Sequence, residues 1–510
     1  MLKLSKLFQN EWIKLFGRKG IKTLIALALC TAILAVGIQM LSDRETKVSW
    51  QEPYQTEISR AEAQLVRYPE YDAKEWASET EYKADVLRWT NEIQKYRFCL
   101  DSGIPSWDWR MGIVDSYFRN LLLMDAVRDG WNAQDLERYF GFPSNLDLTE
   151  VEETNKEWMV YILGNDYSTY NKEQLQLAEE HLLNLKESVF VEGGDKTIAL
   201  AQADTEMLER YVTYNVPANA KDNWVSVAIS RIRENQGKII EWTYDNSSDP
   251  ETARENRMLM EEANASIQKD LFALNNNMPS SDILKDVYTE KTTYLQFFDN
   301  SFLMSASVVI LGIILAAWLV CMEYHYGTIS TLVLYPFKRK SILHAKYLVV
   351  EVTLLGVALL ECLITLCIGK YLYPVIGTQP VFMTVWNGTV YWIPYFVAVL
   401  LRYLAVFVQA VIMVTFTVMI SALVHSRSIS IFSGLFAYLI LPQIVRMTYT
   451  YLGKPAVLRY EMFVNLDLIR FANNTPAVTF AEPWAALLIV IGWWFIFRRV
   501  SYMAYKQQEI

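Results

Sequence analysis

The sequence predicts an all-α polytopic membrane protein with six transmembrane helices and a large helical extracellular domain between the first and the second. Three observations indicate this fold class. The chain of 510 residues is 52% hydrophobic, and its apolar residues gather in long, mostly uncharged runs. Its charges are segregated, because residues 43–299 contain 48 acidic and 27 basic residues and the remainder contains 8 and 20. Within that acidic block, apolar residues recur at helical spacing.

Six apolar runs are long enough to cross a bilayer, which takes about 20 residues of helix. The predicted spans are residues 23–42, 300–322, 347–369, 396–424, 428–446 and 480–500. The last has only 15 uncharged residues, Pro483–Phe497, so we expect Arg498 and Arg499 to extend toward the membrane surface. A cleaved signal peptide is the alternative for residues 23–42, but the apolar part of such a peptide usually has about 7–15 residues.

Lys and Arg predict which side each connection faces. Six spans place both termini on one side, and the segments on that side are all basic: residues 1–22, residues 323–346, the connection holding Arg427, and the end of the chain with its tail 501–510. Basic connections are typical of the cytoplasmic side. We therefore expect a multi-pass protein of the cell membrane with both termini cytoplasmic. The acidic block 43–299 and the loops 370–395 and 447–479 are then extracellular.

The spacing of apolar residues predicts that the acidic block is made of helices. Tyr82, Val86, Trp89, Ile93, Tyr96 and Leu100 are spaced by three and four residues, and a similar stripe runs from Leu175 to Val189. Such spacing places apolar side chains on one face of a helix. The stripes are explained by core packing, and a groove for an apolar ligand is the alternative. The negative charge is explained by a solvated surface, or alternatively by attraction of cationic peptides.

No enzymatic signature is present. The chain has no His-Glu-x-x-His, no Gly-x-Ser-x-Gly and no phosphate-binding loop of the Gly-x-x-x-x-Gly-Lys-[Ser/Thr] type. Its five cysteines lack the spacing of a metal site. The basic residues lie beside membrane spans, which argues against nucleic acid as a partner. We therefore expect neither catalysis nor a metal site in this chain.

The first 22 residues predict a basic amphipathic helix. Leu4, Phe8, Leu15 and either Trp12 or Glu11 share one side of it, with lysines and arginines around them. Such a helix lies in the membrane interface in front of a span. It is either a simple anchor or an elbow that also contacts a cytosolic partner.

The connection 323–346 carries polar residues of specific kinds at set positions. They are Glu323, Gly327, Thr328, Pro336, Arg339 and Lys346. Glycine and proline permit changes of chain direction, and Glu and Arg offer charged contacts to a partner or to each other. An ordinary cytosolic loop is the alternative interpretation.

Together these segments resemble the permeases of the ABC-2 family of ABC transporters. The similarity rests on Glu11 and Trp12 before a span, on a second span ending in Glu323 with Gly327-Thr328 after it, and on Pro336, Arg339 and Lys346 opening the third. It covers about the first 45 residues and most of residues 300–500. The acidic block matches no motif of that family, and bulky residues flank Pro336 where many relatives have small ones.

The resemblance implies a permease subunit that works as a dimer, with an identical or paralogous copy, in the lipid bilayer. Two separate cytosolic ATPase subunits would bind ATP and Mg²⁺, and this chain would hold no cofactor. The connection 323–346 is similar to the coupling helix that contacts the ATPase. The residues assigned to that interface are Glu11, Glu323, Gly327, Thr328, Pro336, Arg339 and Lys346.

Three ionisable residues fall within the predicted spans: Glu351, Glu361 and Arg402. Such residues are costly in a bilayer and point to function or to pairing. Glu361 and Arg402 fall at similar depths on successive antiparallel spans. They are expected to form an ion pair, which is either structural or part of a gate.

The function indicated by the family is outward export of a peptide, drug or lipid-like substrate, driven by ATP hydrolysed in another subunit. The alternative is a membrane sensor whose extracellular domain binds a ligand such as an antimicrobial peptide. The short inner connections, which leave no room for a signalling domain, argue against the sensor.

Overall fold

The computed structural model describes residues 2–30, 34, 49–72, 74–143, 147–188, 194–244, 250–287, 306–326, 338–372, 380–386, 388–451, 460–466 and 483–507. The chain folds into two compact units. Unit 1 consists of Met1–Asp43, Thr292–Gly377 and Ile393–Ile510, and unit 2 of Arg44–Lys291 and Thr378–Trp392. Unit 2 thus combines the acidic block with a short segment from much later in the chain.

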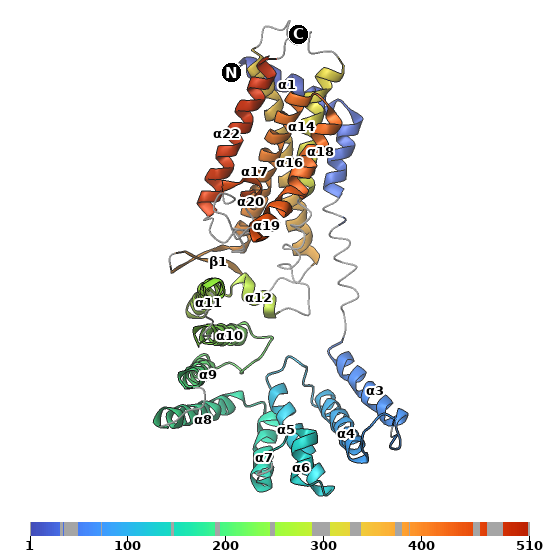
Figure 1. Ribbon diagram of the computed structural model, residues 1–510, viewed down its shortest axis with the longest axis vertical. Coiled ribbons are helices and arrows are strands. Elements are labelled where there is room, and N and C mark those ends of the chain that lie inside the picture. The colour runs from blue at the N-terminus through green and yellow to red at the C-terminus, as the bar shows by residue number, and fades with distance from the viewer. Residues whose placement is uncertain are drawn as a thin grey trace. The chain divides into compact units, whose positions relative to one another are not determined.

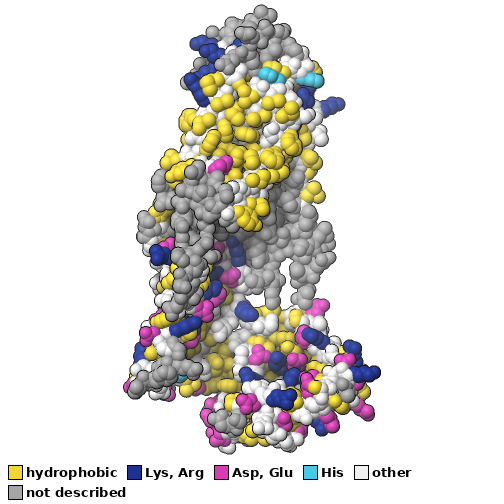
Figure 2. Space-filling model, in the orientation of Figure 1, with side chains coloured by type: hydrophobic (Ala, Val, Ile, Leu, Met, Phe, Trp, Pro, Cys, Tyr) yellow, Lys and Arg dark blue, Asp and Glu magenta, His cyan; other side chains and the backbone are white. Residues whose placement is uncertain are grey.

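Unit 1 is a bundle of long apolar helices that lie side by side (Figure 1). Its elements are α1 (Leu2–Phe16), α14 (Ala306–His325), α16 (Arg339–Leu372), α17 (Tyr395–Val424), α18 (Arg427–Leu439), α19 (Leu441–Tyr451), α20 (Met462–Asn465) and α22 (Pro483–Gln507). Figure 2 shows hydrophobic side chains gathered over these helices. Exposed Leu, Ile and Phe residues on α16, α17, α18 and α22 form this surface. Such an exposed apolar surface suits lipid as its solvent.

Helix α14 lies at the centre of unit 1 and is buried along most of its length. It packs against α16, α17 and α18. Glycines permit the close approach. A Cβ atom on Gly434 of α18 would lie 2.6 Å from Ile313 of α14 and 2.7 Å from Thr417 of α17, and one on Gly312 would lie 2.8 Å from Leu354 of α16. Small residues at such crossings are what helix packing in membranes requires.

Four helices are long and apolar enough to cross a membrane: Ala306–His325, Arg339–Ile368, Tyr395–Val424 and Ala485–Lys506. They coincide with four of the predicted spans, 300–322, 347–369, 396–424 and 480–500. Residues 19–30 are helical and include the start of the predicted first span, 23–42, and most of the remainder of that span lies outside the described residues. The structure therefore supports a helical membrane protein.

The predicted fifth span, 428–446, is divided between two helices. Helix α18 ends at Leu439 and α19 begins at Leu441, so neither is long enough to cross a bilayer by itself. Pro442 explains the break, because proline lacks an N–H group and its ring clashes with the carbonyl four residues earlier in a continuous helix. The predicted span rested on the length of the uncharged run and did not take this proline into account.

Three further boundaries differ from the prediction. The N-terminal helix ends at Phe16 rather than near residue 22, because Gly17 begins a turn and a new helix starts at Lys19. Helix α16 begins at Arg339, so the second part of the connection 323–346 is helical. Helix α22 continues to Gln507 and includes most of the predicted tail 501–510.

In the described part of the acidic block, unit 2 consists of helices joined by short connections, as the periodicity predicted. Its helices are α3 (Gln51–Arg67), α4 (Glu79–Asp101), α5 (Met111–Arg128), α6 (Ala133–Asp135), the π-helical turn η1 (Leu136–Phe140), α7 (Leu148–Gly164), α8 (Tyr167–Glu187), α9 (Asp195–Tyr214), α10 (Trp224–Tyr244), α11 (Pro250–Asn276) and α12 (Ser281–Val287). Helices α8 to α11 pack in series, each on the next (Figure 1). Ser78 illustrates the local signals: its hydroxyl caps α4 by accepting the Glu81 N–H.

Several hydrophobic cores, rather than one, hold unit 2 together. One lies among α4, α5 and α7 and contains Cys99, Ile113 and Ile162. Another lies among α9, α10, α11 and α12 and contains Tyr211 and Ile232. Tyr96 and Leu100 of the first apolar stripe pack against the core that contains Cys99. Tyr82 and Trp89 pack on the buried Trp76. In the second stripe, Leu175, Leu182 and Leu185 are half-buried.

The loop predicted at 370–395 contains a β-hairpin of β1 (Val381–Trp386) and β2 (Thr389–Pro394). Strand β1 packs on α11 and α12, and the Val381 N–H donates to the Pro279 carbonyl oxygen at 3.2 Å. The sequence signal for this hairpin is Asn387-Gly388 between two β-branched and aromatic runs, a pattern typical of a two-residue hairpin turn. Strand β1 thus belongs to unit 2, together with the acidic block.

Candidate functional site

Three residues that the sequence singled out, far apart in the chain, meet inside unit 1. Glu11 comes from α1, Glu323 from the last turn of α14 and Lys346 from the early part of α16. Helix α16 packs against both α1 and α14, which places the three side chains together. We call Glu11, Lys14, Glu323 and Lys346 the ionic cluster.

The Lys346 ammonium is the centre of the ionic cluster. Its Nζ donates to Glu323 Oε1 at 2.7 Å, to the Leu319 carbonyl oxygen at 3.0 Å and to Glu11 Oε2 at 3.2 Å. An ammonium group has three N–H donors, so these three acceptors satisfy it completely. The side chain therefore fixes the spacing of three helices.

The two carboxylates are also satisfied. Lys14 Nζ lies 2.6 Å from Glu11 Oε1 and 3.6 Å from Glu323 Oε1, and the Tyr505 hydroxyl donates to Glu323 Oε2 at 3.3 Å. Two ammonium groups thus face two carboxylates. Burial by itself would raise the pKa of the Glu11 carboxyl, but the charges of Lys346 and Lys14 outweigh it and lower that pKa. The cluster is therefore made of charged groups whose charges sum to zero.

The burial of this cluster corrects the prediction for Glu11, Glu323 and Lys346. Each is only 1% exposed, so none can touch another subunit in this structure. The prediction assigned them to an ATPase interface because the resemblance implies that the connection 323–346 contacts the ATPase. Helix α1 instead packs on α16, and its Lys14 reaches Glu323 of α14. Breaking a buried ion pair by removing one partner typically costs about 3–5 kcal/mol, which suits a structural joint.

Of the other four predicted interface residues, the structure describes only Arg339. Arg339 is partly exposed at the start of α16, and its Nη1 donates to the Lys506 carbonyl oxygen of α22 at 3.1 Å. Gly327, Thr328 and Pro336 lie outside the described residues. Exposed Lys338 borders Arg339, so the accessible part of the described connection is basic.

Glu361 and Arg402 do not pair, which corrects the predicted ion pair. Both are described and buried, and no contact within 4.0 Å joins their charged groups. The Glu361 carboxylate instead accepts a hydrogen bond from the Ser307 hydroxyl of α14 at 2.8 Å. The Arg402 guanidinium lies 6.0 Å from the Tyr395 ring centroid, one and a half to two turns away on its own helix. Similar depth in the membrane was a poor guide, because the two side chains face different neighbours.

Glu351 of α16 is half-buried, and among the described residues its buried Oε1 atom has no hydrogen-bond partner.

A polar contact joins α16 to α22. His344 Nδ1 of α16 lies 2.8 Å from Arg498 Nη2 and 3.0 Å from the Tyr502 hydroxyl, both on α22. The sequence analysis missed this contact between α16 and α22. It also missed Tyr505, because the tail was expected to leave the helix at residue 500. A helix predicted to continue to residue 507 would have included Tyr505, but not its contact with Glu323.

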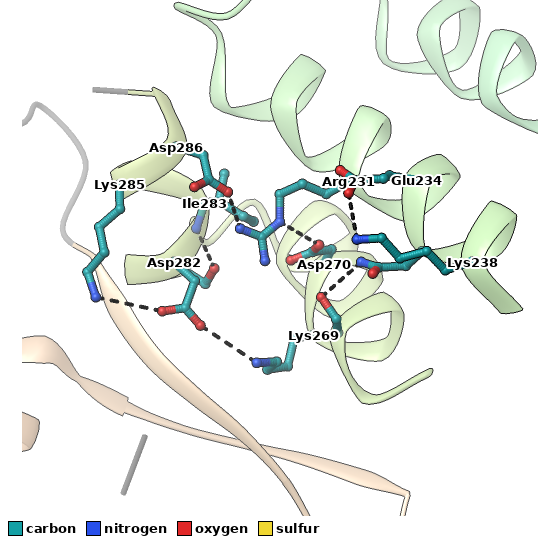
Figure 3. A network of polar contacts seen from close by, with 12 residues as sticks. Arg231, Glu234, Lys238, Lys269, Asp270, Asp282, Ile283, Lys285 and Asp286 are labelled. Atoms are coloured by element: carbon teal, nitrogen blue, oxygen red, sulfur yellow. Dashed lines mark hydrogen bonds and ion pairs between the residues drawn. The ribbon is translucent and has the colours of Figure 1, made fainter. Parts of the chain in front are cut away.

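Unit 2 has its own polar network, shown in Figure 3, which joins α10, α11 and α12. The Arg231 guanidinium bonds both Asp270 of α11, at 3.0 Å, and Asp286 of α12. Lys269 lies 3.6 Å from Asp282. Asp270 is fully buried, and burial raises the pKa of its carboxyl to about 6 despite the facing Arg231. This network ties down α12, the last described element of unit 2 before the chain enters α14.

Among the described residues, no group of three or more His, Cys, Asp or Glu side chains could hold a metal ion. Neither polar network has the nucleophile and base of a catalytic site. What the ionic cluster can do is mechanical, since it joins three helices beside a short basic connection.

Comparison with known proteins finds one similarity, in the second half of the chain. Residues 266–510 match a family described as a protein of unknown function, DUF2705. The match includes α12 and every described element from α14 to α22. No curated protein matches the chain.

Proposed function

We propose that the chain is the transmembrane permease subunit of an ATP-binding cassette exporter of the ABC-2 type. A separate cytosolic subunit would bind ATP and Mg²⁺, and the permease would move a peptide, drug or lipid-like substrate outward. The observation that carries the proposal is the ionic cluster. Glu11 and Lys346 are 335 positions apart, and two of the motif residues on which the resemblance rests, Glu11 and Glu323, converge on the ammonium group of a third, Lys346.

The cluster suggests how the permease would respond to its motor. Lys346 joins the two helices that flank the connection 326–338 and also binds α1. Interactions between buried charges fix geometry closely, so a force on the connection would move α1, α14 and α16 together. Such a rigid-body shift of packed helices is the kind of motion that switches access across a membrane.

In this proposal the ATPase contacts the accessible residues of the connection. Lys338 and Arg339 are the described candidates, and Gly327, Thr328 and Pro336 complete the set. Both termini would be cytoplasmic in the cell membrane, six spans would cross it, and unit 2 would be extracellular. A second permease copy, identical or paralogous, would complete the transporter.

The test is affinity purification of the full chain from its native membrane in mild detergent, followed by an ATPase assay. We expect a nucleotide-hydrolysing subunit to copurify and Arg339→Glu to abolish ATP-driven export while leaving membrane insertion intact. Lys6→Glu, an equal charge reversal at an exposed position of α1, is the matched control and should export normally. A purified complex without an ATPase, or normal export by Arg339→Glu, would contradict the proposal.

A membrane sensor is the second candidate, favoured by the net charge of −21 on residues 43–299. A negative surface attracts cationic peptides over long range. The same purification separates the two functions. Binding of a cationic peptide by a chain that carries no ATPase companion would favour the sensor.

A further inference from the structure

A basic and aromatic surface lies at the end of α14 that holds Glu323. We call Arg18, Trp318, Tyr326 and Arg427 the Arg18–Arg427 patch. The Arg18 guanidinium carbon lies 5.2 Å from the ring centroid of Trp318 and 5.2 Å from that of Tyr326. Its Nη1 donates to the Tyr326 hydroxyl oxygen at 3.3 Å. The two rings hold the guanidinium in a defined orientation while the side chain remains exposed.

Arg427 reaches the same end of α14 from another element. It is the first residue of α18, two residues after His425. The His425 and Tyr324 rings are 4.2 Å apart, so the connection between α17 and α18 rests on the last turn of α14. Among the described residues, the buried Arg427 Nε atom has no hydrogen-bond partner. Arg427 is close enough to Tyr326 for its charge to act on the Tyr326 hydroxyl.

The charge of the patch is uncompensated. Among the described residues, neither Arg18 nor Arg427 lies within 4.0 Å of a carboxylate oxygen, whereas Lys14 and Lys346 each face two. The hydrogen bond and charge of Arg18 lower the pKa of the exposed Tyr326 hydroxyl, and the charge of Arg427 lowers it further. The neighbourhood of Tyr326 is thus positive, which favours an anion.

The surroundings indicate which anion. Trp318 lies in a helix long enough to cross a membrane, near the end where aromatic side chains usually meet the bilayer surface. On α18, Ile429 and Phe432 follow Arg427 and are 50% and 69% exposed. A ligand with a phosphate at the arginines and hydrocarbon along α18 fits both features. A planar guanidinium matches phosphate oxygens in a way that an ammonium does not.

We propose that the Arg18–Arg427 patch binds the phosphate of an anionic lipid headgroup, with the acyl chains along the exposed apolar face of α18. This site is separate from the ionic cluster, and it does not depend on the proposed export function. It requires only that this end of α14 lies at a membrane surface.

The test measures lipid retention by the full-length protein in detergent, using native mass spectrometry with added phosphatidylglycerol or phosphatidylcholine. We expect the native protein to retain phosphatidylglycerol in preference to phosphatidylcholine. Arg18→Gln/Arg427→Gln should weaken phosphatidylglycerol binding at least tenfold. Lys6→Gln/Lys338→Gln removes the same charge from exposed positions on α1 and before α16, and should bind as the native protein does.

Two variants separate the site from general effects. Arg18→Lys/Arg427→Lys keeps the charge but loses the planar donors, and we expect it to bind more weakly than the native protein. Because Arg18 also packs on two rings, Arg427→Gln alone serves where the double variant fails to fold. It should lose affinity while its melting temperature in phosphatidylcholine is unchanged.

Three results would overturn the proposal. Equal losses in the glutamine variant and in the Lys6/Lys338 control would show attraction by net charge without a built site. Competition by soluble glycerol phosphate at the lipid's own concentration would make this a site for a soluble anion. Unchanged phosphatidylglycerol retention in Arg427→Gln and in the double glutamine variant would remove the site altogether.

Discussion

Lys346 shows what a single residue contributes to this molecule. An ammonium group transferred from water to the protein interior costs several kcal/mol, and the cost is offset only when every donor finds an acceptor. Lys346 meets that condition with Glu11, Glu323 and a backbone carbonyl. Such a group tolerates little displacement of its partners, so it specifies how α1 sits on α14 and α16.

Removing Lys346 alone should therefore be more harmful than removing its charge together with those of Glu11 and Glu323. We expect Lys346→Ala to destabilise the protein by about 3–5 kcal/mol, because two buried carboxylates lose their main partner. Glu11→Gln/Glu323→Gln/Lys346→Met leaves no charge unpaired at these three positions and should lose less. Thermal unfolding of the full chain in detergent measures both. A triple variant as unstable as Lys346→Ala would mean that lost packing, rather than unpaired charge, explains the effect.

Asp270 is a buried charged residue of unit 2, as Lys346 is of unit 1. Its burial predicts that the free energy of unfolding depends on pH. Its folded-state pKa is raised to about 6, so between the unfolded value near pH 4 and about pH 6 the folded protein binds more protons than the unfolded chain. Stability should therefore rise as pH falls through this range. The stability difference between the native protein and Asp270→Asn should shift by about 1.4 kcal/mol between pH 7.5 and pH 5.

Thermal unfolding of both proteins at the two pH values checks this sign. Because the variant cannot titrate at residue 270, the comparison subtracts every other ionisable group, including Lys269 and Asp282, which also act on Asp270. A shift in the opposite direction would mean that the Arg231 ion pair outweighs burial.

At the scale of elements, close contacts among α14, α17 and α18 organise unit 1. At Gly434, α18 lies so near both other helices that a Cβ atom would meet Ile313 of α14 and Thr417 of α17. Residues 428–446 do not form one long helix, and α18 owes its place to this crossing rather than to length. The short helix is held by packing.

Gly434→Ala should therefore destabilise unit 1. The added methyl group meets Ile313 and Thr417 at under 3 Å, and overpacking of this kind costs about 1–3 kcal/mol. Gly492→Ala on α22 is the matched control, because a Cβ atom there meets nothing within 4 Å. Thermal unfolding of the two variants in detergent should show a loss for the first only. Equal melting temperatures would place α18 farther from α14 than the structure has it.

For the whole molecule, the hairpin gives information on topology. Strand β1 packs on α11 and α12, so the chain on either side of α14 and α16 returns to the same unit. The proposed six-span topology therefore requires residues 44–291 and 378–392 to share one side of the membrane. The basic connection after α14 must lie on the other side if α14 and α16 both cross it.

Cysteine labelling in intact cells tests this arrangement. In a background without the five native cysteines, a membrane-impermeant maleimide should label Gln176→Cys on α8 and Thr389→Cys on β2. It should leave Lys338→Cys unlabelled until the membrane is opened. Labelling of Lys338→Cys together with the other two would contradict both the topology and the proposed ATPase contact.

The sequence by itself determined the helical character of both units and the approximate place of four spans. These properties follow from local spacing and from apolar length, which neighbours in the chain already carry. It also picked out Glu11, Glu323 and Lys346, although not what they touch. The hairpin had a local signal in Asn387-Gly388, and the break before α19 had one in Pro442.

Only the tertiary structure decided that these three charges are buried together, that Glu361 faces Ser307 instead of Arg402, and that β1 joins the acidic block. Each of these depends on which faces of separate helices meet. Helical spacing gives the direction of a side chain relative to its own axis, but the rotation of one helix against another is set by packing between residues distant in the chain. That information resides in the contacts of the folded molecule.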